Sequence, residues 1–262
     1  MRFPATAKVM AFLRERNRLI RPNNLKVNDW VDSYLDRCVV NGAAVTILTQ
    51  WCISKDLEQR YQKQGGTFIP IKKERRIFEG EIPKIAEVFL ANGFRLNWWV
   101  TSNRSYIDSG RISPGLESGY KALVANLIRP LVREGWLILA DWEDDILAQR
   151  PQPNREVLTS PQRYVQPQAL ELEIKRHSSW TREGAGLTQT DGELRRDVFY
   201  QIACEAEEGR LLSGSDSPLG EFILMPLEAP ERYDFFTLLA PDFKRRIAAV
   251  LSPYPWRLRE TQ

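Results

Sequence analysis

Ser54 has the clearest position for a nucleophile in this sequence. It ends residues 44–54 (AVTILTQWCIS), whose apolar and β-branched composition predicts a buried strand. A helix is predicted directly after it, and open α/β proteins place their chemistry where parallel strands end. The alternative role for Ser54 is to cap that helix. Cys52 faces the same side of the strand and is a second candidate, although a cysteine in a buried strand usually serves as a small hydrophobic residue.

Tyr200, Gln201 and Glu205 form a second group with chemical potential. In a helix, Gln201 and Glu205 share a face because they are four residues apart, and Tyr200 lies beside them. A buried glutamate near a tyrosine hydroxyl can move protons to and from a substrate. The alternative is an exposed glutamate on an amphipathic helix.

Polar side chains also follow two further predicted strands, residues 95–101 and 136–142. Carboxylates at such strand ends can hold a guanidinium group through paired hydrogen bonds, whereas the alternative is a solvated acidic turn. We therefore expect a substrate-binding site at this edge of the sheet. Its candidate residues are Asn103, Arg104, Tyr106, Asp108, Asp141 and Glu143.

Basic residues gather in two short segments. Residues 2–26 hold seven lysines and arginines, and Glu15 is their only acidic residue. Such segments can bind the phosphates of RNA, although charge runs are more often solvated surface. The candidate tRNA-binding residues are Arg14, Arg16, Arg18, Lys72, Lys73, Arg75 and Arg76.

The elements between these groups predict a Rossmann-like α/β fold, a parallel sheet flanked by helices. Helical spacing alternates with the three strands as far as residue 142, and the connections are long enough for right-handed crossovers. We expect a single domain over residues 1–262, with a basic N-terminal helical arm over about residues 1–27. The predicted helices of this part cover residues 5–19, 28–38, 56–64, 77–89 and 113–134.

The remaining segments are predicted from local patterns. Residues 67–71 have the composition of an edge strand, and the four prolines of residues 149–168 indicate an irregular segment. Residues 221–227 are predicted as a fourth strand. Helices are predicted at residues 168–180, 191–210, 230–239 and 241–251.

Composition narrows the possible functions. The 262 residues are 43% hydrophobic, and three cysteines without a signal peptide favour a reducing, cytoplasmic location. His177 is the only histidine, which removes most metal sites, and no apolar stretch reaches membrane-spanning length. The glycine-rich nucleotide motifs are missing. We therefore expect no metal, no cofactor and no membrane, and a substrate that arrives already activated.

Together these features resemble the tRNA-dependent cyclodipeptide synthases, and more specifically their arginine-using branch. That family has a serine after its first core strand, in a stretch like G-x-S-x-x-N-S-Y, and a Tyr-x-x-x-Glu motif on a later helix. Here Cys52-Ile53-Ser54-Lys55-Asp56-Leu57 supplies the serine without the glycine or the asparagine, and Tyr200 and Glu205 are five residues apart. The resemblance covers roughly residues 40–257, mainly through the order of the elements.

The resemblance implies a fold like the catalytic domains of class I aminoacyl-tRNA synthetases, without the ATP site. It implies that Ser54 takes an aminoacyl group from one charged tRNA, arginyl-tRNA being one expected substrate. A second aminoacyl-tRNA extends it to a dipeptide, which cyclises while Glu205 and Tyr200 manage protons. Two alternatives remain open at this point: a Rossmann-like hydrolase or acyltransferase that acts on a small molecule, and an RNA-binding α/β module without catalysis.

Overall fold

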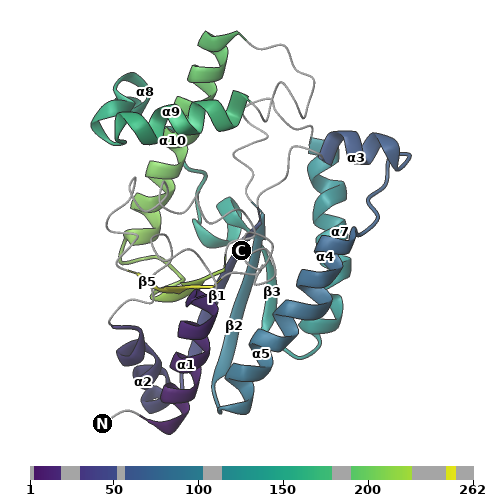
Figure 1. Cartoon of the computed structure of the whole chain (residues 1–262), viewed down its shortest axis with the longest axis vertical. Helices are drawn as coiled ribbons and strands as arrows, with labels where there is room; N and C mark the ends of the chain where they lie inside the picture. The colour runs from purple at the N-terminus through teal and green to yellow at the C-terminus, as the bar shows by residue number, and fades with distance from the viewer. Residues whose placement is uncertain are drawn as a thin grey trace.

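The protein is built around one parallel sheet, seen in a computed structural model that describes residues 3–18, 30–51, 57–102, 114–178, 190–225 and 246–251. The described strands lie in the order β3-β2-β1-β4-β5, and every neighbouring pair is parallel (Figure 1). This order is that of a doubly wound α/β sheet. The predicted Rossmann-like fold class is therefore confirmed. The strands are β1 (Ala44–Trp51), β2 (Arg95–Ser102), β3 (Leu137–Asp141), β4 (Phe222–Leu224) and β5 (Ile247–Val250).

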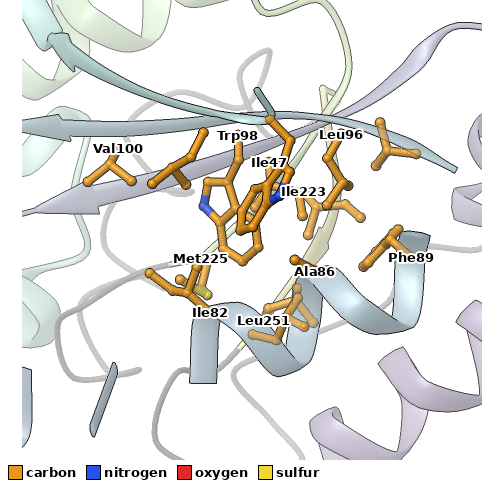
Figure 2. Close-up of a cluster of buried hydrophobic side chains, with 14 of the residues drawn as sticks. Ile47, Ile82, Ala86, Phe89, Leu96, Trp98, Val100, Ile223, Met225 and Leu251 are labelled. Carbon is orange, nitrogen blue, oxygen red and sulfur yellow. The ribbon is translucent and has the colours of Figure 1, made fainter. Parts of the chain in front are cut away.

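Four helices cover one face of the sheet. Alternate strand residues, among them Ile47 and Trp98, point into this layer and are fully buried. Figure 2 shows them facing Ile82, Ala86 and Phe89 across the core. Because the apolar spacing of each helix matches this face, one large cluster joins sheet and helices. The covering helices are α1 (Pro4–Arg18), α2 (Val31–Asn41), α5 (Ile82–Ala91) and α7 (Pro114–Val132).

The opposite face carries a smaller apolar cluster. Leu48, Phe222 and Leu224 point to this side of the strands. They pack with Trp142 of the π-helix η2 (Trp142–Ile146) and with Leu212, near the end of α10 (Asp191–Ser213).

A third cluster forms a helical subregion beyond the carboxyl end of the sheet (Figure 1). It contains the first half of α10, which begins at a capping box in which Thr190 and Glu193 satisfy each other's backbone N–H groups. The segment predicted as irregular is therefore partly ordered into short helices. The other helices here are α8 (Arg155–Thr159), the 3-10 helix η3 (Pro161–Arg163) and α9 (Pro167–Ser178).

One long helical segment runs from Lys72 to Ala91 and changes its winding in the middle. The helix α4 (Lys72–Arg75) continues into the π-helix η1 (Arg76–Glu81) and then into α5. The Ile82 N–H donates to the Ile77 carbonyl, five residues back. Pro83 explains the wide turn, because it has no N–H and its ring would crowd the carbonyl four residues before it.

Two predicted elements are wrong. Residues 67–71 form no strand but an irregular segment, where the Ile69 N–H donates to the Gln64 side chain at 2.9 Å. Residues 247–250, predicted as the end of a helix, form β5. The Phe222 N–H donates to the Arg246 carbonyl and the Leu251 N–H donates to the Leu224 carbonyl, and these bonds hold the segment beside β4. The helix predicted at residues 230–239 lies outside the described residues.

The N-terminal helix is part of the folded core. Val9, Met10 and Leu13 of α1 are buried in the main cluster, and Lys8 and Arg14 are exposed on the helix. Lys8 and Arg14 of this basic segment therefore lie on the outer face of a packed helix.

Candidate active site at the carboxyl edge of the sheet

The sheet has a topological switch point between β1 and β4. From β1 the order proceeds through β2 to β3, and on the other side through β4 to β5. The chain therefore leaves these two neighbouring strands in opposite directions, and α/β proteins bind their ligands in the crevice that results. Ser54 and Cys52 follow β1 by at most three residues, although both lie outside the described residues.

The helix α10 carries a polar stripe on its buried face. Leu194 and Val198 belong to the helical subregion, and Leu212 belongs to the cluster on the sheet. Between them the same face presents Glu205, which is 6% exposed, and Glu208, which is fully buried. The buried face of α10 is thus apolar at both ends and acidic in the middle.

Gln201 fixes one of these carboxylates. Its side-chain amide donates to Glu205 Oε1 at 2.8 Å, which agrees with the prediction that the two residues share a helix face. Glu205 is buried, so the alternative of an exposed glutamate does not describe it. Glu208 was not predicted as a site residue, although its spacing of three from Glu205 and seven from Gln201 is a detectable signal.

Tyr200 is half-buried on the same helix. Five residues of an α-helix correspond to a rotation of about 140°, so Tyr200 and Glu205 leave α10 in different directions. The helix by itself brings Gln201 and Glu205 together, but not Tyr200 and Glu205.

The acidic end of β3 is partly used in local structure. Asp141 caps η2 by accepting from the backbone N–H groups of Glu143 at 3.1 Å and Asp144 at 3.3 Å. Its carboxylate also forms an ion pair with Lys121 of α7. Asp141 therefore holds the end of the strand in place, while Glu143 is buried at 1% exposure beside it. The other predicted binding residues, Asn103, Arg104, Tyr106 and Asp108, lie outside the described residues.

An arginine anchors the chain that follows the first strand. Arg60 of α3 (Leu57–Lys63) forms a two-pronged ion pair with Glu74 of α4, with one N–O distance of 2.8 Å. It also donates to the Ile69 carbonyl and lies over the Phe68 ring. Because Arg60 and Glu74 are both largely buried, their ion pair fixes α3 to α4.

The predicted basic residues have different environments. Arg16 is buried and forms an ion pair with Glu81 of η1, which fixes the end of α1 beside that helix. Arg14, Lys72, Arg75 and Arg76 are exposed, and Arg75 pairs with Glu79 at 3.1 Å. The side chains of Arg18 and Lys73 lie outside the described part of the chain.

The described residues contain neither a candidate metal cluster nor a candidate membrane-spanning helix. Within the ranges given above, no group of three histidine, cysteine, aspartate or glutamate side chains is arranged to hold a metal ion. In those same ranges, we find no helix with the length and apolar character needed to cross a bilayer.

Comparison with known proteins gives a match in structure only. No protein-family model matches the chain, and no curated protein sequence matches it. The crystal structure of the PvcA protein from Pseudomonas aeruginosa is similar, with a TM-score of 0.56 and 13% sequence identity over 87% of this chain and 81% of that chain. The likeness supports the α/β fold.

Proposed function

We propose that the protein is an aminoacyltransferase that makes a cyclic dipeptide from two aminoacyl-tRNAs, at least one of them arginyl-tRNA. One observation carries the proposal: the polar stripe of α10, where Gln201 donates to the buried Glu205. The stripe lies between the apolar cluster on the sheet and the helical subregion beyond its carboxyl end, where such sheets bind ligands. The position of Ser54 after β1 and the family resemblance support the same function.

The proposed reaction needs no further activation, because each substrate is already an ester. The Ser54 hydroxyl attacks the ester carbonyl of the first aminoacyl-tRNA, and the tRNA leaves with its hydroxyl protonated. The amino group of the seryl-bound residue attacks the second ester and releases the second tRNA. The new amino group then attacks the seryl ester, which closes the ring and regenerates the Ser54 hydroxyl.

Glu205 is proposed to accept the proton that each attacking amino group must lose. The hydrogen bond from Gln201 orients its carboxylate, which is a requirement for proton transfer at a fixed position. Tyr200 is proposed to act on the substrate from a different face of α10, about 140° around the helix from Glu205. The exposed residues Lys72, Arg75 and Arg76 are proposed to contact tRNA phosphates, whereas the buried Arg16 is left out of this surface.

The test is mass spectrometry of small molecules from cells that express the protein. We expect a cyclic dipeptide containing arginine, and a loss of about 100-fold or more with Glu205→Gln, the usual range for a general base. Gln201→Leu should lower the yield by a smaller factor, because Glu205 keeps its charge but loses its orientation. Glu207→Gln is the matched control, since that residue pairs with Arg210 on the same helix and should leave the yield unchanged. If folded protein yields no cyclic dipeptide, the proposal is wrong.

A second measurement separates the alternatives. Ser54→Ala should abolish product while tRNA binding, and its decrease with added salt, persist. A small-molecule hydrolase or acyltransferase would show no salt-dependent affinity for RNA. An RNA-binding module would be indifferent to substitution of Ser54, Tyr200 and Glu205.

A further inference from the structure

The edge strand β3 exposes an apolar surface that the proposed function does not use. It has only β2 as a neighbour in the described sheet, and Figure 1 shows it at the opposite side from β5. Ile138 and Leu139 point to opposite faces and remain 40% and 36% exposed. The strand has neither the lysine nor the proline with which proteins usually protect such edges.

The backbone N–H and C=O groups of β3 point alternately towards β2 and away from the sheet. The Trp98 N–H donates to the Trp136 carbonyl at 2.8 Å, so the polar groups of Trp136, and by alternation those of Ile138, face β2. The N–H and C=O groups of Leu137 and Leu139 therefore face outward. At the end of the strand the outward N–H of Asp141 donates to Asp145 Oδ2 at 2.6 Å, so pairing is blocked beyond that point.

We propose that two copies of this chain associate through antiparallel pairing of their β3 edges. A two-fold axis beside Ile138 places Leu137 of one copy opposite Leu139 of the other, where each pair exchanges its backbone hydrogen bonds. The two sheets then become continuous, and Ile138 and Leu139 lose part of their exposure.

The charges at the two ends of β3 favour this orientation. Arg133, before the strand, is exposed and forms no ion pair with any residue of the described ranges. Asp144 and Asp145, after the strand, are exposed and acidic. Antiparallel pairing brings the basic end of one strand to the acidic end of the other, whereas a parallel arrangement would place like charges together.

Disulfide trapping tests the geometry. Two copies of residue 138 form a pair without mutual hydrogen bonds, with Cα atoms about 4.5 Å apart, which lies within the range for a disulfide. We expect the full-length Ile138→Cys variant to give a covalent dimer under mild oxidation, at least about tenfold faster than Leu172→Cys. Leu172 is the matched control because it is 65% exposed on α9. If the two variants form covalent dimers at equal rates, while a maleimide labels their introduced cysteines equally, the proposal is wrong.

Sedimentation velocity tests the interface without cysteines. The wild-type protein should show a concentration-dependent dimer, which Ile138→Lys removes and Leu172→Lys leaves unchanged. Arg133→Glu should weaken the dimer, and the added substitution Asp144→Arg should restore it. A wild-type protein that stays monomeric at every concentration, or a dimer that Ile138→Lys does not affect, contradicts edge pairing.

Discussion

At the scale of single residues, the position of a carboxylate decides what it can do. Glu205 and Glu208 are buried, and burying a charged group is costly unless hydrogen bonds or opposite charges compensate for it. Asp141 lies at the end of a strand, and its capping bonds and its ion pair with Lys121 explain it as a structural group. The sequence alone predicts that Gln201 and Glu205 share a helix face, because that depends only on helix geometry. The sequence does not show that Glu205 is buried while Asp141 caps a helix, because burial and capping depend on tertiary packing.

Glu193 gives a prediction about pH at the same scale. The backbone N–H of Thr190 donates to its carboxylate and lowers the pKa of Glu193 below its ordinary value of 4.5. A lowered pKa in the folded state stabilises the fold at pH values above 4.5, and this contribution is lost as the pH falls through the lower folded pKa. Glu193→Gln should therefore be less stable than wild type in urea at pH 7, and the difference in stability should disappear at pH values below the folded pKa of Glu193. A difference that is constant with pH would contradict this account.

At the scale of elements, polar side-chain contacts fix the two short helices α3 and α4 to each other. Arg60 joins α3, the irregular residues 67–71 and α4 through Glu74. The composition of residues 67–71 predicts a strand, but this group of contacts offers their backbone other partners, including Gln64. Local propensity failed here because the side chains of Arg60 and Gln64, and not a neighbouring strand, supply the hydrogen bonds to this backbone.

We therefore expect Arg60→Met to destabilise the protein by about 3 kcal/mol, because Glu74 is left as a buried charge without its counter-ion. Urea unfolding of the double variant Arg60→Met/Glu74→Met should show a smaller loss than the single variant. Arg75→Met is the control, since its exposed pair with Glu79 should contribute at most about 0.5 kcal/mol. If Arg60→Met and Arg75→Met have equal effects, Arg60 is not an anchor.

At the scale of the whole molecule, the fold follows from periodicity and connection length. The strands β1, β2 and β3 and their intervening helices are predictable because each has a strong apolar pattern and a clear stop signal. The strand β5 is not, because the alanine-rich stretch that contains it also suits a helix. Its pairing with β4, on the far side of the switch point, determines its structure.

The helix α10 belongs to two apolar clusters, and this has a consequence for how the molecule opens. Between Ala206 and Leu211 the helix contributes no residue to either cluster, so its two halves should lose protection from hydrogen exchange in separate cooperative events. Native-state exchange in low denaturant should show two opening energies along α10. In α7, whose buried residues all belong to one cluster, it should show one. A ligand that spans the acidic stripe would merge the two events, so exchange along a single helix would report occupancy of the site before any product is measured.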